Sequence, residues 1–155
     1  MIDAGTAEAG QGQPSGTHSA HASTSGKPGH QPSHAPRVPN ALSCSGEQAP
    51  EPQFSPSNQT IHWGYKVICN SATSISIIDT LYVVEGTGDN EHNVEQGEVT
   101  NSGVAPNLVV GTFHACGGSV RTRWITESWA KANNSPVNPY PAWSPVNTLT
   151  CGPWQ

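Results

Sequence analysis

Charge is scarce in this sequence: Asp, Glu, Lys and Arg make up 11% of its 155 residues, and the formal net charge is −5. The six basic residues form no basic patch, which a nucleic-acid partner requires. No apolar run approaches the ~18 residues that a membrane-spanning helix needs. We therefore expect neither nucleic acid nor a membrane as a partner.

Sequence motifs that signal catalysis are absent as well. There is no Gly-x-Ser-x-Gly, no His-Glu-x-x-His and no glycine-rich phosphate loop. Five acidic residues lie between positions 85 and 98, but their spacing matches no calcium-binding loop, so 85–98 is predicted to be an exposed acidic loop. We expect no catalytic residue, no metal site and no cofactor.

Four cysteines are present, Cys44, Cys69, Cys116 and Cys151, and none forms a Cys-x-x-Cys pair. That spacing excludes zinc ribbons and thioredoxin-like redox motifs. With so few charges and abundant Ser, Thr, Asn and Gly, the composition is typical of a secreted, disulfide-braced domain, the alternative being four buried free thiols. We expect secretion, although Met1–Gly16 has neither the basic segment nor the apolar core of a signal peptide.

The first 43 residues are rich in Gly, Ser, Ala, Pro, Thr, Gln and His, and contain few large aliphatic side chains. Such a segment cannot bury enough apolar surface to offset the entropy lost on ordering, so residues 1–43 are predicted to form a disordered tail. His18, His21, His30 and His34 have helical ligand spacings, but the surrounding Gly, Pro and Ser form no helix. The compact domain is predicted to span residues 44–155.

Two kinds of sequence pattern predict β-strands. Apolar and polar residues alternate from Thr60 to Cys69, and the β-branched run from Ser74 to Val84 lacks good helix formers. Further strands are predicted at 108–116, 119–130 and 147–151.

Turn signals separate these segments. Gly117-Gly118 is suited to a two-residue hairpin turn between two of the predicted strands, and four prolines break regular structure from 132 to 148. Several short strands without a convincing helix predict an all-β fold: a small, disulfide-braced β-sandwich of the immunoglobulin-like type, preceded by the disordered tail.

Five tryptophans are many for a domain of this size. Trp63 and Trp124 fall on apolar strand faces and are predicted to be core residues. Trp129, Tyr140, Trp143 and Trp154 lie at strand ends or in proline-rich loops, where exposed rings serve as protein-binding hot spots or as platforms for sugars. The alternative is that these rings cap the open end of the sandwich.

Three further residues stand out along the chain. Phe54 lies in the extended segment 51–61, where it is predicted to anchor a partner by strand addition. His62 and His114 fall in predicted strands opposite the apolar faces, so their side chains are expected to face solvent.

Three short sequences support a resemblance: Tyr65-Lys-Val-Ile-Cys69, Cys116-Gly-Gly followed by Arg121-Thr-Arg123, and Leu149-Thr-Cys151. From Cys44 onward their order resembles that of small exported actinobacterial proteins built on a two-disulfide β-sandwich. Some of those proteins look like adaptors in larger secreted assemblies, including the umbrella-shaped toxin particles of Streptomyces. There, an extended terminus and a compact domain link a lectin-like subunit to a scaffold.

The resemblance also implies a disulfide pairing. Four cysteines allow three pairings, and the sequence alone does not choose between them. The resemblance implies Cys44–Cys69 and Cys116–Cys151.

Two functional hypotheses remain from the sequence. The first is a secreted, noncatalytic protein–protein interaction module, such as an adaptor or an enzyme inhibitor, whose partner is another secreted protein. The second is a carbohydrate-binding module that uses the C-terminal aromatic residues to bind a glycan. The first hypothesis names Phe54, Trp129, Tyr140 and Trp143 as the partner-binding residues. The second uses the C-terminal aromatic residues only and does not include Phe54.

Overall fold

The structure, a computed structural model, describes residues 40–154. The predicted tail, apart from residues 40–43, lies outside these residues, as do His18, His21, His30 and His34. The described chain is all-β, with one short 3-10 turn, η1 (Gly88–Asn90). Its strands are β1 (Cys44–Gln48), β2 (Gln53–Ser55), β3 (Thr60–Glu85), β4 (His92–Ala115), β5 (Arg121–Ala132), β6 (Ser135–Pro136), β7 (Ala142–Trp143) and β8 (Asn147–Thr150).

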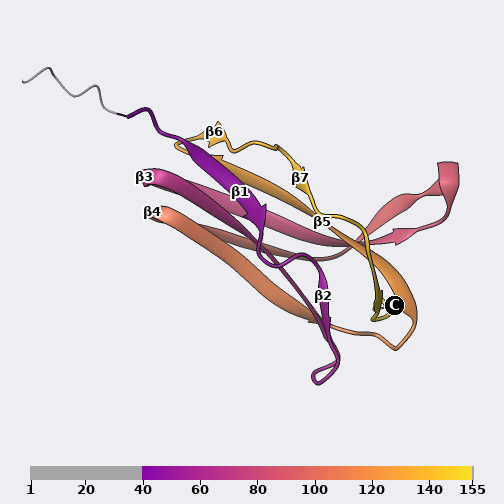
Figure 1. The fold of residues 1–155 in the computed structure, drawn as a ribbon. Helices are drawn as coiled ribbons and strands as arrows, with labels where there is room; N and C mark the ends of the chain where they lie inside the picture. Colours follow the sequence, from indigo (N-terminus) through magenta and orange to yellow (C-terminus); the bar gives the residue numbers. More distant parts are fainter. Residues whose placement is uncertain (1–39, 155) are drawn as a thin grey trace, which may run out of the picture. The chain divides into compact units, whose positions relative to one another are not determined.

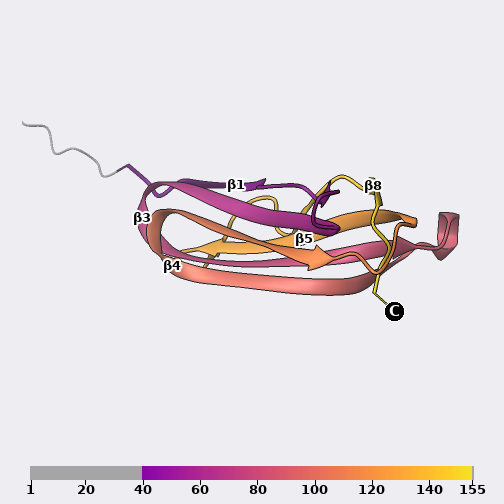
Figure 2. The ribbon, with the colours of Figure 1, turned by 90° about the horizontal axis from the view of Figure 1, so that it is seen from below.

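Strands β3 and β4 form one long antiparallel hairpin that folds back on itself. Their pairing has a register shift between Ile68 and Thr73 of β3, where the hairpin folds back, and a second shift between Leu81 and Tyr82. On its other side, the first half of β3 pairs with β1 and β2, and the second half pairs with β5. The two halves lie in two layers (Figures 1 and 2), so a single folded sheet makes both walls of the sandwich.

The alternation of side chains along β3 explains how one strand serves both walls. Odd-numbered residues are buried in both halves: Ile61, Trp63, Tyr65, Val67 and Cys69 in the first, and Ile75, Ile77, Asp79, Leu81 and Val83 in the second. A sheet that folds back on one of its faces keeps that face inside. The odd-numbered side chains of β3 therefore point into the core both before and after the strand folds back.

The core consists of two apolar clusters. The first contains Tyr65, Val67, Cys69, Ile75, Ile77, Val110, Ala130, Ala132, Val137 and Ala142. The second contains Ile61, Trp63, Leu81, Val83, Trp124 and Cys151. Each cluster includes a cysteine of one disulfide: Cys44–Cys69 joins β1 to β3, and Cys116–Cys151 joins the end of β4 to the end of β8.

These features confirm the all-β, disulfide-braced sandwich and both implied disulfide pairs. Trp63 and Trp124 are core residues, as predicted. Two disulfides are characteristic of an extracellular or otherwise oxidising environment. Within residues 40–154, no helix has the length and apolar character needed to cross a membrane.

Ordered contacts begin slightly before the predicted boundary at residue 44. The side chain of Asn70 donates a hydrogen bond to the carbonyl of Ala41 (2.8 Å) and accepts one from the N–H of Ser43 (3.1 Å). The folded domain therefore includes the residues that lead into β1.

The hairpin predicted at Gly117-Gly118 is wrong. β5 pairs with β3 and not with β4, because β4 ends in one layer and β5 begins in the other. The two glycines instead let the C-terminal segment approach closely: Gly117 N–H donates to Gly152 O (2.9 Å), and Gly152 N–H donates to Gly118 O (2.8 Å). A Cβ at position 117 would lie 2.2 Å from the carbonyl oxygen of Pro153, so no side chain fits there.

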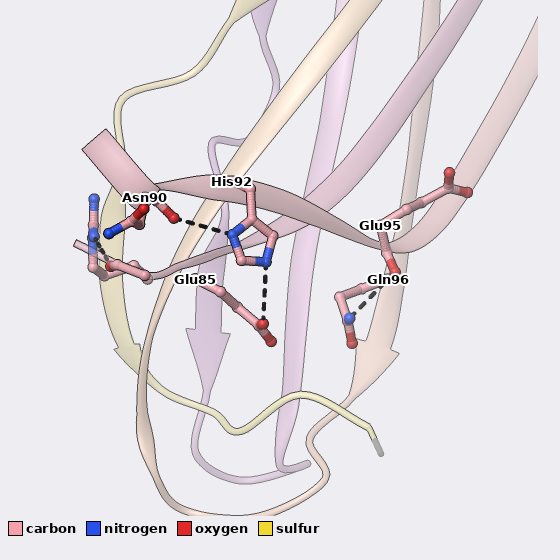
Figure 3. A network of polar contacts seen from close by, with 7 residues as sticks. Glu85, Asn90, His92, Glu95 and Gln96 are labelled. Atoms are coloured by element: carbon pink, nitrogen blue, oxygen red, sulfur yellow. Dashed lines mark hydrogen bonds and ion pairs between the residues drawn. The ribbon is translucent and has the colours of Figure 1, made fainter. Parts of the chain in front are cut away.

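The acidic loop predicted at 85–98 is also shorter than expected, because β3 continues to Glu85 and β4 begins at His92. Glu95 and Glu98 lie in β4, whereas Asp89 and Glu91 lie in the short connection, and all four are exposed. Figure 3 shows His92 Nε2 near Glu85 Oε2, at 3.6 Å. Arg123 Nη1 lies 2.7 Å from Glu91 Oε1, which ties the connecting turn to β5.

Removing either disulfide should destabilise the domain without changing its fold. The bonds close loops with sequence separations of 25 and 35 residues. In the chain-entropy model, loops of this length contribute about 3–4 kcal/mol each. We expect a loss of this size in the free energy of unfolding for Cys44→Ala/Cys69→Ala and for Cys116→Ala/Cys151→Ala, measured by urea denaturation with the other disulfide intact. A loss below about 1 kcal/mol for either pair would contradict this account.

Candidate functional site: an aromatic binding face

Three of the aromatic residues predicted to bind a partner come together on one face of the sheet. Trp129 lies in β5, Trp143 in β7, and Tyr140 in the loop that precedes β7. Even-numbered side chains of β5 are buried, so Trp129 points outward. Trp143 pairs directly with Glu127 of β5, and directly opposed residues share a face. Trp129 and Trp143 therefore project from the same outer surface.

Trp129 has an aromatic neighbour and an aliphatic one. Its ring packs edge-on against that of Tyr140, with centroids 4.8 Å apart and an interplanar angle of 88°. This geometry is favoured because the ring edge is positive and the ring face is negative. Ile78 of β3 lies directly opposite Trp129 and is 42% exposed, whereas Trp129 is 37% exposed.

Trp143 borders a second pair of side chains. Its ring centroid lies 6.1 Å from that of Tyr82, whose hydroxyl donates a hydrogen bond to Glu127 Oε2 (3.2 Å). Burial and the neighbouring carboxylate of Glu127 raise the pKa of Tyr82, so the phenol remains a hydrogen-bond donor. The aromatic face is defined here as Ile78, Tyr82, Glu127, Trp129, Tyr140 and Trp143.

Two other aromatic residues lie apart from this face. Phe54 belongs to β2, opposite Ile61, and packs half-buried against the second core cluster. It is therefore held within the fold and is not free as an anchor in a linker. Trp154 donates its indole N–H to the carbonyl of Ala115, and its ring packs edge-on against His114.

His114 does not face solvent, contrary to the prediction. The inward positions of β4 are odd-numbered from Gly97 to Ala105 and even-numbered from Leu108 onward, because the register shift at the fold skips unequal numbers of residues on β3 and β4. Burial lowers the pKa of His114. His62 lies on the outer face as predicted, with its ring centroid 5.8 Å from that of Phe113.

A buried polar layer separates the two apolar clusters. Asp79 is 0% exposed, and its Oδ1 accepts a hydrogen bond from Ser128 Oγ (2.8 Å). Gln48 Nε2 donates to Ser128 Oγ (3.3 Å), and Gln48 Oε1 accepts from Thr126 Oγ1 (3.0 Å). Since Gln48 belongs to β1 and the hydroxyls belong to β5, this chain of hydrogen bonds joins the two walls.

Asp79 has a pKa that is unusual for a carboxyl group, and burial is the main cause. Burial raises the pKa of Asp79 to about 7, and the hydrogen bond from Ser128 offsets part of this effect. Burial and the nearby Asp79 also raise the pKa of the Tyr65 phenol. A Cβ at Gly46 would lie 2.1 Å from the Tyr65 hydroxyl, so glycine is needed to seat this ring. We assign Asp79 a structural role, because it is sealed from solvent.

Sequence reasoning missed half of the aromatic face and the whole polar layer. Ile78, Tyr82 and Glu127 were not singled out, because their neighbours depend on the register of β3 against β5. A signal for Asp79 was present, since it shares the odd numbering of the buried residues of β3.

No family model and no curated protein matches this chain. Among solved structures, it is similar to Spo0M, a sporulation control protein from Bacillus subtilis, with a TM-score of 0.32 and 9% sequence identity. The match covers 72% of this chain and 49% of that chain, so this chain spans about half the length of that protein.

Ionisation of Asp79 should destabilise the folded protein. The pKa of an Asp in an unfolded chain is about 3.9, whereas burial raises that of Asp79 to about 7. Between these values the folded protein keeps a proton that the unfolded chain has lost. The contribution of Asp79 to the free energy of unfolding therefore falls as pH rises from about 4 to about 7, by up to about 1.4 kcal/mol per pH unit, and is level above pH 7.

The variant Asp79→Asn isolates this contribution, because asparagine has a similar shape and does not ionise. Urea unfolding at about pH 5 and pH 8 should show Asp79→Asn gaining stability relative to the wild type as pH rises. Glu98→Gln, which removes an exposed carboxylate of the same sheet, is the control. Its difference in stability from the wild type should change little between the two pH values. Equal pH profiles for the wild type and Asp79→Asn would show that Asp79 titrates normally.

Proposed function

We propose that this protein is a secreted, noncatalytic binding module that recognises another secreted protein through its aromatic face. The proposal is carried by the half-exposed rings of Trp129 and Trp143, the latter 46% exposed, held on a disulfide-braced sheet. Trp and Tyr dominate the hot spots of protein interfaces, because large rings bury much area with little loss of conformational entropy. Rings fixed by strand pairing lose even less entropy on binding.

The surroundings of these rings favour a protein as the partner. Ile78 adds aliphatic contact area directly beside Trp129. Charged residues border the apolar centre: Lys131 follows two positions after Trp129 on the same face, and Glu98 lies beside Thr80. An apolar centre with a polar rim is the usual anatomy of a protein interface.

A carbohydrate is the second candidate, because rings on a sheet can stack on sugars. Sugar recognition also needs polar side chains that are free to bond the hydroxyl groups. On the aromatic face, Glu127 is the charged side chain, and Tyr82 orients it by a hydrogen bond (3.2 Å). The aliphatic contact area of Ile78 beside Trp129 makes a protein partner the stronger proposal.

Secretion and an adaptor role complete the proposal. The two disulfides, the low charge and the resemblance to small exported proteins support a place outside the cytosol. A compact domain preceded by a long segment of tail-like composition suits an adaptor in a larger secreted assembly. The domain then holds one component through its aromatic face and leaves residues 1–43 available for another. An enzyme inhibitor would use the same face.

Trp129→Ala/Trp143→Ala should abolish partner recovery while the domain stays folded. Tagged protein is recovered from culture fluid, the accompanying protein is identified, and its affinity is measured with the purified components. A hot-spot ring contributes about 2 kcal/mol or more to the free energy of binding. Trp129→Ala and Trp143→Ala, tested singly, should therefore each weaken binding about 30-fold. Both rings are half-exposed, so the unfolding midpoint should change little.

Trp154→Ala is the matched control, because it removes an exposed tryptophan that lies off the aromatic face. It should leave partner binding unchanged. Tryptophan fluorescence that is quenched by a soluble polysaccharide, and only in proteins retaining Trp129 and Trp143, would favour the carbohydrate-binding function. Turnover of any substrate that one side-chain change abolishes would contradict a noncatalytic module.

A further inference from the structure

β4 forms a sheet edge that carries no charged side chain from Val99 onward. Among the strands between residues 40 and 154, β4 pairs only with β3, so it is the edge in both layers (Figure 1). The sequence from Val99 to Val120 contains no Asp, Glu, Lys or Arg. Sheet edges are usually blunted by charged side chains, above all Lys, because free backbone groups otherwise invite another strand. This edge lacks that protection.

Neighbouring hydrogen bonds show which backbone groups of the edge are free. The N–H and C=O of Gly64 both bond to the segment that joins β1 and β2, at 2.9 and 2.8 Å, so they point away from β4. Gly111 lies directly opposite Gly64. When one residue of an antiparallel pair points its backbone groups away from the partner strand, the opposite residue does the same. The groups of Gly111 therefore point to the free edge, as do those of Val109 and Phe113 by alternation.

The side chains beside these groups are apolar and exposed. Val109 is 48% exposed and Phe113 is 64% exposed, both on the outer face of the sheet. One edge carbonyl is occupied, since Asn101 Nδ2 donates to Val109 O (2.8 Å). A carbonyl oxygen accepts two hydrogen bonds, so Val109 O retains a site for an incoming strand.

We propose that this edge pairs with the same edge of a second copy of the chain, across a two-fold axis centred on Gly111. In that register Gly111 lies opposite its own copy, and Val109 lies opposite Phe113 of the second copy. Each of these residues then exchanges N–H and C=O hydrogen bonds with the opposing strand. A β-branched residue opposite an aromatic one is a favourable cross-strand pair.

The uncharged edge suits a second copy as the occupant. Each molecule has a formal net charge of −5, so two copies repel, and a contact between them requires a surface where neither presents a charged side chain. The stretch Val109–Phe113 meets this condition, and its register is self-complementary, as an isologous interface requires. On the opposite side of the sandwich, the short strands β6, β7 and β8 pair with β5 and cover its edge. The inference is independent of the proposed function, and the dimer would carry two aromatic faces.

The first test is the oligomeric state of the full chain, measured by sedimentation over a range of concentrations. The wild type should dimerise reversibly. Val109→Lys/Phe113→Lys sets Lys opposite Lys across the axis and should weaken the dimer about tenfold or more. Val120→Lys, the same change at an exposed valine outside β4, should leave it intact. A monomeric wild type, or a dimer lost on Trp129→Ala/Trp143→Ala and unaffected by the edge lysines, would overturn the proposal.

The second test fixes the register by cross-linking. Directly opposed, hydrogen-bonded residues have Cα atoms about 5.5 Å apart, which a disulfide can span. Gly111→Cys should therefore form a disulfide-linked dimer under mild oxidation, with Cys44–Cys69 and Cys116–Cys151 unchanged by non-reducing peptide mapping. Val109→Cys lies four positions from its own copy in this register and should stay unlinked. Cross-linking of Val109→Cys in place of Gly111→Cys would refute the axis at Gly111.

Discussion

The structure depends on the alternation of side chains along β3, which buries odd-numbered residues in both halves of the strand. This strand pairs with β1, β2, β4 and β5, and its odd-numbered residues fill the core from both walls. The same alternation places the even-numbered residues outside. Ile78 and Tyr82 therefore reach the aromatic face because Ile77, Asp79 and Leu81 are buried. A shift of one residue in the register of β3 would exchange core and surface together, so the fold and the aromatic face are set by one pattern.

Within that frame, the polar layer determines how the two walls sit over each other. Hydrogen bonds require particular distances and directions, and so add to the constraint that close packing of the apolar side chains imposes. Gln48 reaches from one wall to Thr126 and Ser128 on the other, and Ser128 bonds in turn to Asp79. The layer lies between two apolar clusters, each of which holds a disulfide cysteine. Covalent bonds thus brace the ends of the sandwich, and the hydrogen bonds align its middle.

The sequence was sufficient for the features that depend on local pattern. Alternation from Thr60 and the β-branched run after Ser74 predicted the two halves of β3, and the composition predicted a disulfide-braced all-β domain. The long-range features were not predictable in this way. Nothing local shows that β3 and β4 fold back together, so Gly117-Gly118 resembled a hairpin turn and His114 appeared to face outward. The grouping of Trp129, Tyr140 and Trp143 was expected only as exposed rings, because their contacts with Ile78 and Tyr82 follow from strand register.

The two disulfides also define a route for mechanical force. Cys44 is the first residue of β1 and Cys151 follows the last strand, so each bond lies at one end of the folded domain. Tension applied through the flanking residues passes from Cys44 directly to Cys69, along the chain to Cys116, and through the second bond to Cys151. The segments 45–68 and 117–150 are bypassed, including Trp129, Tyr140 and Trp143. A module pulled by its two ends would therefore transmit load through covalent bonds and the β3–β4 hairpin while these three rings stay outside the stretched path.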